Sequence, residues 1–131
     1  MNTTSLDLSK RIATLEGGNG VSEYWWVSKM KYENFGEGFK RVDDSWVAEK
    51  SRTLSPSGLG WIVPALTTDE LLERLPFICE GKYLQLDKSK NTYWAGYVSI
   101  DNITEISKNG DIPAEALGLL YEHLLIKGLI T

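Results

Sequence analysis

Residues 111–126 read DIPAEALGLLYEHLLI, the most regular pattern in the chain. Pro113 favours the first turn of a helix, because a proline there loses no intrahelical hydrogen bond. Large apolar residues recur at the spacing i, i+3, i+4 and i+7, namely Leu117, Leu120, Tyr121 and Leu124. This spacing puts them on one stripe and predicts a helix over 113–126 that packs against a sheet. Gly128 is suited to the position just after the end of that helix.

A second, shorter helix is predicted over 68–75. Thr67 and Glu70 have the spacing of a capping box, in which each side chain accepts a hydrogen bond from the other residue's backbone amide. Leu66 and Leu71 occupy the two staple positions around the box, and Pro76 ends the helix. A third helix is predicted over 5–15, after a cap at Thr4 or Ser5, with an apolar stripe of Leu8, Ile12 and Leu15.

Strands are predicted where aromatic and β-branched residues are frequent and alternate with polar ones. The predicted strands cover 24–30, 46–54, 61–64, 82–86 and 92–99. Pro64 indicates that 61–64 is a short edge strand. Two apolar faces indicate that 92–99 is a central strand, or one whose outer side carries a ligand or partner. Residues 33–44, with two glycines, are predicted to be a long connection. Helices and strands do not alternate strictly, so the sequence predicts one α+β domain over 1–131 with about four or five mostly antiparallel strands.

The first two predicted strands combine tryptophans with basic residues. Alternation places Trp25, Lys29 and Lys31 on one face of the first strand, and Trp46, Lys50 and Arg52 on one face of the second. If the strands pair antiparallel, we expect both sets on one surface, with rings for stacking and cations for phosphate. The predicted ligand-binding residues are Trp25, Trp26, Lys29, Lys31, Trp46, Lys50 and Arg52. The alternative places the tryptophans in the core, with the basic side chains reaching water at the strand ends.

The chain is poor in the residues on which catalysis and metal binding usually depend. It has one histidine, His123, and one cysteine, Cys79, among 131 residues. We therefore expect no catalytic residues, no metal and no cofactor, and a protein that is not an enzyme. His123 lies off the apolar stripe, which indicates a solvated helix residue. Cys79 follows an apolar stretch, which indicates a buried thiol.

Charge and hydropathy limit the partners. The net charge of −4 disfavours bulk binding of nucleic acid, which normally needs a basic surface. Eight basic and eight acidic residues balance over 1–60, so a local basic site there stays open. No apolar run reaches the length of a membrane span, and residues 1–10 lack the apolar core of a signal peptide. The expected location is the cytoplasm, without membrane contact.

The second half of the chain also has a familiar order of segments. These are PALTTDELLERLP at 64–76, YLQL at 83–86, YWAGY at 93–97 and AEALGLLYEHLLIKGLI at 114–130. This order resembles small accessory proteins of unassigned function from bacteriophages, prophages and related mobile elements. The resemblance implies expression in the cytoplasm of an infected or lysogenic bacterium, and it carries over no catalytic residue.

Two non-catalytic functions suit this setting and the aromatic and basic residues. The first is sequestration of a nucleotide-like defence signal on the predicted ligand-binding residues, which would counteract a host factor. The second is a protein-binding inhibitor or structural accessory protein that uses its aromatic surface as an interface with a host protein. Large aromatic residues are favoured at interfaces, so we also expect a homo-oligomer, most simply a two-fold dimer.

Overall fold

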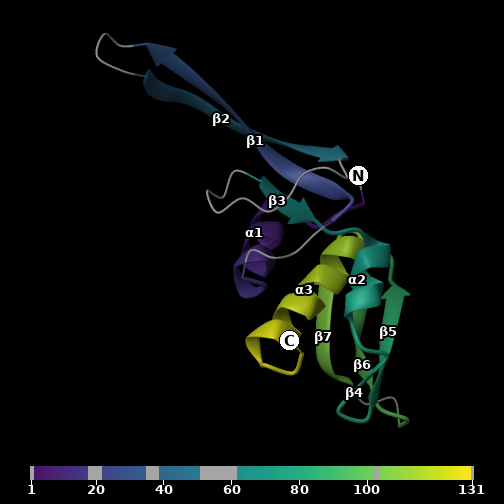
Figure 1. Cartoon of the computed structure of the whole chain (residues 1–131). Helices are drawn as coiled ribbons and strands as arrows, with labels where there is room; N and C mark the ends of the chain where they lie inside the picture. Colours follow the sequence, from purple (N-terminus) through teal and green to yellow (C-terminus); the bar gives the residue numbers. More distant parts are fainter. Residues whose placement is uncertain (1, 18–21, 35–38, 51–61, 102–103, 131) are drawn as a thin grey trace.

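The computed structural model describes the backbone of residues 2–17, 22–34, 39–50, 62–101 and 104–130 (Figure 1). Side chains are described for 2–17, 22–26, 63–101 and 106–130. The helices are α1 (Leu6–Leu15), α2 (Thr68–Arg74) and α3 (Pro113–Ile126). The strands are β1 (Tyr24–Asn34), β2 (Phe39–Lys50), β3 (Ile62–Ala65), β4 (Ile78–Cys79), β5 (Lys82–Lys88), β6 (Tyr93–Val98) and β7 (Thr104–Gly110).

The strands form two sheets, in which every described pair of neighbours is antiparallel. One sheet has the order β2-β1-β3 and the other the order β4-β5-β6-β7. The predicted α+β class and antiparallel pairing are confirmed, as are the edge position of β3 and the central position of β6. The expected antiparallel sheet with helices packed on it is present as the four-stranded sheet, and the described chain adds a second sheet of three strands.

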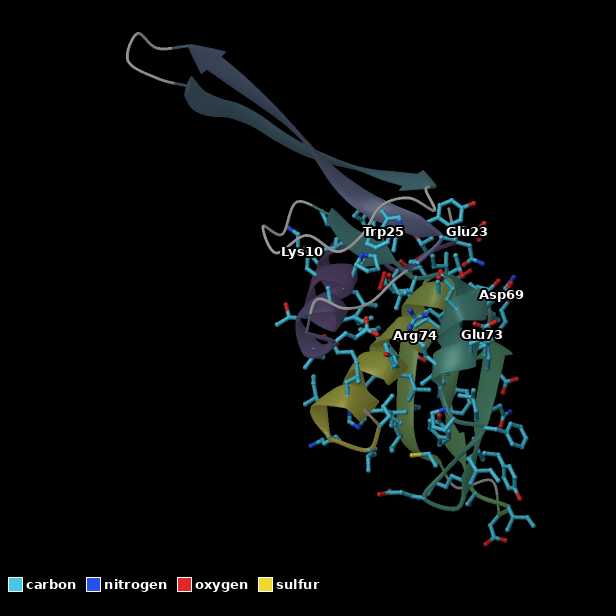
Figure 2. All side chains as sticks on the ribbon, viewed as in Figure 1. Lys10, Glu23, Trp25, Asp69, Glu73 and Arg74 are labelled. Atoms are coloured by element: carbon cyan, nitrogen blue, oxygen red, sulfur yellow. The ribbon has the colours of Figure 1, made fainter. Side chains whose placement is uncertain are left out.

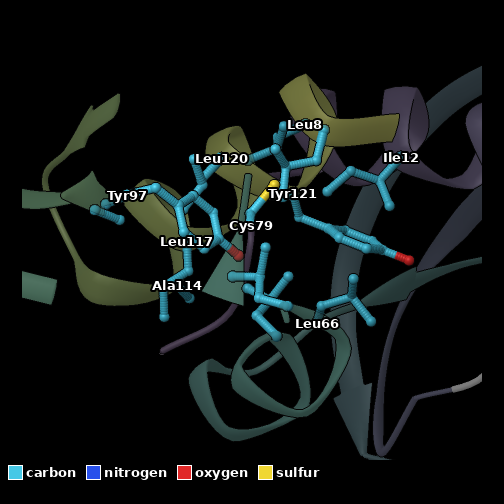
Figure 3. Packing of buried hydrophobic residues seen from close by; sticks show 14 residues of the cluster. Leu8, Ile12, Leu66, Cys79, Tyr97, Ala114, Leu117, Leu120 and Tyr121 are labelled. Carbon is cyan, nitrogen blue, oxygen red and sulfur yellow. The ribbon is translucent and has the colours of Figure 1, made fainter. Parts of the chain in front are cut away.

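Helix α3 is the centre of the core. It packs against β6 and β7 of the four-stranded sheet, and α1 and α2 pack against it as well (Figure 1). Leu117, Leu120 and Leu124 are completely buried, and Tyr121 keeps only 5% of its surface exposed. Their predicted stripe is confirmed, and Figure 3 shows it packed among residues of α1 and of the segment before α2.

The segment before α1 is hydrogen-bonded to Leu66, which lies between β3 and α2. Thr4 is fully buried; its backbone amide donates to the Leu66 carbonyl at 2.9 Å, and its hydroxyl accepts from the Leu66 amide at 3.2 Å. A glycine on α3 allows this close approach. A Cβ atom on Gly118 would lie 2.6 Å from a Thr4 methyl group and 2.8 Å from Leu8, so any side chain there would push α1 away.

The predicted start of α2 is confirmed in detail. The Glu70 amide donates to the Thr67 hydroxyl at 3.2 Å, and the Glu70 carboxylate accepts from the Thr67 amide at 3.0 Å. Leu66 and Leu71, the staple residues, are both buried. The helix ends at Arg74, two residues before Pro76. At α1 the cap is Ser5, whose hydroxyl accepts from the Leu8 amide.

The largest difference from the sequence-based expectation lies in 33–44. These residues do not form a long connection; β1 continues to Asn34, β2 begins at Phe39, and the two strands form a hairpin. The second strand therefore begins seven residues earlier than predicted and ends at Lys50. Residues 51–54, which were also predicted as strand, lie outside the described residues.

The hairpin of β1 and β2 reaches beyond the rest of the molecule. Strand β3 pairs only with residues 24–27 of β1, so residues 28–34 and 39–46 form a two-stranded ribbon, here called the arm. Figure 1 shows the arm projecting away from the helices and the four-stranded sheet. With seven or eight residues in each strand, its length is about 25 Å.

Candidate functional site

The two tryptophans of the predicted ligand site lie at the base of the hairpin. Trp25 is opposite Glu49 on β2 and Pro64 on β3, and only 1% of its surface is exposed (Figure 2). A ring buried to that extent has no free face for stacking on a ligand. Trp26 is half-buried, and its indole nitrogen donates to the Thr4 carbonyl at 3.0 Å. Both side chains therefore help to join the hairpin to the rest of the molecule.

The register of the hairpin separates the residues that the sequence grouped together. Ser28 pairs with Trp46 and Tyr24 with Lys50, so positions 46 and 50 share a face with the even-numbered positions of β1. Positions 25, 29 and 31 lie on the other face. The expectation that Trp25, Lys29 and Lys31 share a surface with Trp46 and Lys50 is wrong. Trp25 pairs with Glu49 and not with Lys50, and a shift of one residue moves a position to the opposite face of the sheet.

Arg52, the last residue of the predicted site, lies outside the described residues. The ligand-binding role of the seven residues stays a prediction. However, the pairing of β1 and β2 does not place these residues on one surface. The same two strands group a different set of residues.

That grouping is the collection of the large apolar residues of the arm on one of its two faces. One register shift occurs in the hairpin: Lys31 pairs with Asp43 but Tyr32 pairs with Arg41, so Val42 has no partner on β1. Strand β1 therefore alternates without interruption. One face carries four large apolar residues and is here called the apolar face; it comprises Ser28, Met30, Tyr32, Asn34, Phe39, Arg41, Asp44 and Trp46. The other comprises Lys29, Lys31, Glu33, Lys40, Asp43 and Ser45.

Sequence reasoning missed the apolar face for an identifiable reason. Because 33–44 looked like a connection, Tyr32, Phe39 and Trp46 were not placed on one ribbon. Alternation alone also gives the wrong face beyond Val42, since the unpaired residue shifts the phase of β2 by one. A sign was present in the sequence: Tyr32 and Phe39 flank a segment rich in glycine and charge, as the strands of a hairpin do.

A second candidate lies on the face of the four-stranded sheet that carries Trp94. Gly96 follows two residues later on the same face, and the sheet there has a hollow of about 410 Å³. The lining residues come from β5, β6 and β7 and include Gln85, Trp94 and Asn109. The Gln85 amide nitrogen donates a hydrogen bond to the Asp87 carboxylate at 2.5 Å, so this donor is already engaged within the protein. The hollow offers one aromatic ring and few convergent donors.

The lone histidine and the lone cysteine lie in the part of the molecule formed by the three helices and the four-stranded sheet, here called the body. Burial, followed by the charges of Lys108 and Lys127, lowers the pKa of His123, so its imidazole is neutral at pH 7. Among the described residues, none forms a hydrogen bond with this imidazole. Cys79 is buried, and burial raises the pKa of its thiol, which keeps the sulfur protonated. His123 is thus half-buried rather than fully solvated, while the expectation of a buried thiol is confirmed.

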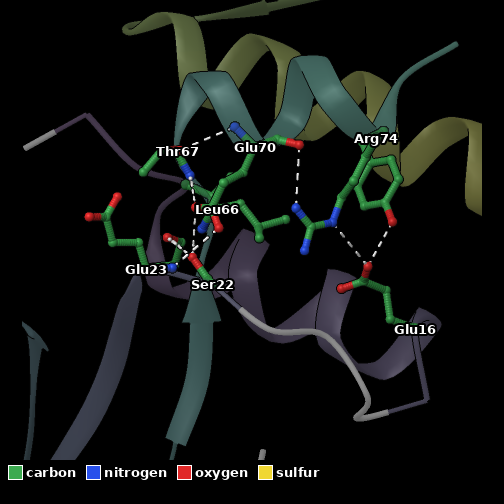
Figure 4. A network of polar contacts seen from close by, with 10 residues as sticks. Glu16, Ser22, Glu23, Leu66, Thr67, Glu70 and Arg74 are labelled. Atoms are coloured by element: carbon green, nitrogen blue, oxygen red, sulfur yellow. Dashed lines mark hydrogen bonds and ion pairs between the residues drawn. The ribbon is translucent and has the colours of Figure 1, made fainter. Parts of the chain in front are cut away.

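The polar groups between the three helices form a structural clasp. The Tyr121 hydroxyl of α3 donates to the Glu16 carboxylate at 2.7 Å, and Arg74 of α2 lies 3.6 Å from the same oxygen (Figure 4). Burial and then the hydrogen bond to Glu16 raise the pKa of Tyr121 well above its usual value. One Glu16 oxygen is buried without a hydrogen bond, which leaves part of its desolvation cost uncompensated. The clasp joins α1, α2 and α3.

The described residues contain no group of three or more histidine, cysteine, aspartate or glutamate side chains placed to hold a metal ion. None of the described helices has the length and apolar character needed to cross a bilayer. No protein-family model, no curated protein and no solved structure matches the chain.

Proposed function

We propose that this chain is a non-catalytic accessory protein that binds another protein through the apolar face of its arm. The observation that carries the proposal is the register of β1 and β2. It collects Met30, Tyr32, Phe39 and Trp46 on one side of a ribbon that extends beyond the body. In the bacterial setting that the sequence resemblance implies, the partner would be a host protein.

The stability of the arm supports a partner. A two-stranded hairpin is marginally stable in water, and it gains stability when a hydrophobic face packs against something else. Beyond residue 27 of β1, the described strands and helices add no third strand to the arm. Figure 1 shows no helix lying along the arm. A partner seated on the apolar face would supply the missing layer.

The composition of the two faces supports a protein rather than a nucleotide as the partner. Tyrosine, tryptophan, phenylalanine and methionine are enriched at the centres of protein interfaces, where charged residues are depleted. The opposite face has three lysines, one glutamate, one aspartate and one serine, a pattern that suits exposure to water. A nucleotide site would instead need stacking rings with an excess of phosphate-binding cations on the same face. The one cation of the apolar face, Arg41, is accompanied there by an acidic residue, Asp44.

The proposal is tested by crosslinking from the two faces of the arm. A photoreactive residue is placed at position 30 or at position 31, which are adjacent in sequence and on opposite faces. After irradiation in bacterial host cells, we expect one discrete crosslinked protein from position 30 and none, or a much weaker band, from position 31. A matched chain with Tyr32→Ser and Phe39→Ser should lose the crosslink and keep its melting temperature.

The outcomes separate clearly because the two labelled positions differ only in their face. Equal crosslinking from positions 30 and 31 would show contact without a preferred face and would contradict the proposal. A crosslink that survives the two serine substitutions would show that the apolar face is not the binding surface.

A further inference from the structure

The outer edge of β2 is a long strand edge that no described strand covers. Strand β2 has 12 residues, and it lies at the end of the order β2-β1-β3. An edge strand presents a row of backbone amides and carbonyls that can pair with a strand of another chain. The edges of β3 and β4 are shorter, with four and two residues. The edge of β2 is therefore the longest open template among the described strands.

The sequence of this edge is complementary to itself. Residues 40–44 read Lys-Arg-Val-Asp-Asp, with two basic residues before Val42 and two acidic residues after it. When two copies of such a segment run antiparallel, the basic half of each copy meets the acidic half of the other. Opposite charges across neighbouring strands stabilise a sheet, whereas like charges directly opposite destabilise it.

The complementarity extends to both faces of the strand. Lys40 and Asp43 pair with Glu33 and Lys31 of β1, so these two positions share the face of the arm opposite the apolar face. Arg41 and Asp44 pair with Tyr32 and Met30 and share the apolar face. Each face thus has one basic position before Val42 and one acidic position after it. Residues directly opposite each other in an antiparallel pair lie on the same face, so a second copy can set its Asp44 opposite Arg41 on the apolar face.

We infer that two copies of this chain pair edge to edge through β2, antiparallel and around a two-fold axis between Val42 and Asp43, with Arg41 of each copy opposite Asp44 of the other. Such an axis stands perpendicular to the sheet and makes the contact isologous, which is the arrangement of most dimers. The dimer would contain one continuous sheet with the order β3-β1-β2-β2-β1-β3. This inference goes beyond the proposed function, because the dimer can form whether or not the arm binds another protein.

The dimer also changes the size of the apolar face. A two-fold axis perpendicular to a sheet keeps the same face of both copies on the same side, so the two apolar faces become neighbours. One arm about 25 Å long and about 10 Å wide offers only about 250 Å². A standard protein interface buries roughly 800 Å² on each partner. Doubling the face brings the arm closer to that size.

The test uses charge reversal at Arg41 and Asp44. Both positions lie opposite uncharged residues of β1, so a reversal creates no like-charge pair within one arm. The wild-type chain should sediment at twice the chain mass at micromolar concentration and low salt. Arg41→Glu and Asp44→Lys should each weaken the dimer, with a dissociation constant raised about tenfold or more. The double variant Arg41→Glu/Asp44→Lys should recover dimerisation, because the two signs are exchanged.

Mixing the single variants gives the sharper measurement. Arg41→Glu supplies two acidic positions and Asp44→Lys supplies two basic ones, so an equimolar mixture should form a one-to-one heterodimer although each variant alone is monomeric. Lys90→Glu and Asp101→Lys are matched controls, since they change the net charge equally at exposed residues outside β2 and should leave the dimer intact. Far-ultraviolet circular dichroism checks that every variant is folded.

Three results would overturn the inference: a wild-type chain that sediments only as a monomer, single variants that stay fully dimeric, or folded variants that do not associate on mixing. The last two would place any dimer interface away from β2. None of these results bears on crosslinking of a different protein from position 30, so this inference and the proposed function fail separately.

Discussion

The body and the arm of this molecule are stabilised by different means. In the body, α3 buries its apolar stripe against a sheet and two helices, and Leu117, Leu120 and Leu124 are inaccessible to solvent. In the arm, the described contacts are those of one antiparallel ladder between β1 and β2. The difference indicates that residues of the body serve mainly stability, whereas the proposed role of the apolar residues of the arm is binding. Substitutions can test how sharp this division is.

The largest effect is expected in the middle of α3. Leu120→Ala should lower the free energy of unfolding by about 2–5 kcal/mol, because it removes buried methyl groups and leaves a cavity that the tightly packed core cannot fully close. Denaturant melts followed by tryptophan fluorescence measure the loss. Ile126→Ala on the same helix is the control; Ile126 is 61% exposed, and its loss should stay within about 0.5 kcal/mol. Similar losses of unfolding free energy for both variants would mean that the apolar stripe of α3 is not the main part of the core.

A smaller effect is expected at the start of α2. Thr67→Ala removes the hydroxyl that accepts from the Glu70 amide and should cost about 1 kcal/mol. The conservative Thr67→Ser keeps that hydroxyl and should retain most of the stability. Both are measured by thermal melts under identical conditions. If the serine variant loses as much as the alanine variant, packing of the threonine methyl group rather than capping explains the loss.

The third prediction concerns pH and His123. The pKa of His123 is lowered in the folded chain, chiefly by burial, so below its ordinary value of 6.5 the unfolded chain binds the proton more readily. Stability should therefore be complete above pH 6.5 and should fall as the pH drops toward the folded pKa. The variant His123→Gln should show a flatter dependence between about pH 7 and pH 5 in denaturant melts. Parallel curves for the two proteins would contradict this role of the histidine.

The smallest effect on the body is expected from the arm. Met30→Ser and Tyr32→Ser together should change the free energy of unfolding of the body by no more than about 0.5 kcal/mol, because neither position contributes to the described core. The measurement belongs at a concentration where the chain is monomeric, so that association does not contribute. A loss of about 2 kcal/mol or more would mean that arm and body unfold as one unit and that the division between them is false.

The sequence predicted best those elements whose signals are local. The capping box at Thr67 and Glu70, Pro113 at the start of α3 and the apolar stripe behind it are all contained in a few consecutive residues. Such signals depend on backbone geometry within one turn, so they need no knowledge of distant segments. The same is true of the hairpin formed by β5 and β6, whose strands were predicted within two residues of their ends.

The elements that were missed depend on distant neighbours. Strand β7 was not predicted, and of its seven residues only Ile106 is a large apolar one. It becomes a strand through pairing with β6, which supplies both the ladder and the buried face. The faces of the arm were predicted wrongly because one unpaired residue, Val42, changes the phase of β2. A bulge of this kind leaves no pattern in the sequence that local reasoning can detect.

The position of α3 in the chain also determines the order in which the molecule can be completed during synthesis. It is the last of the described elements, yet α1, α2, β6 and β7 all pack against it. On a translating ribosome, the apolar sides of α1 and α2 therefore remain uncovered until α3 has emerged from the exit tunnel. The arm has the opposite timing, because β1 and β2 are close in sequence and can pair as soon as residue 50 is free. The arm can thus form on a nascent chain whose core is still open.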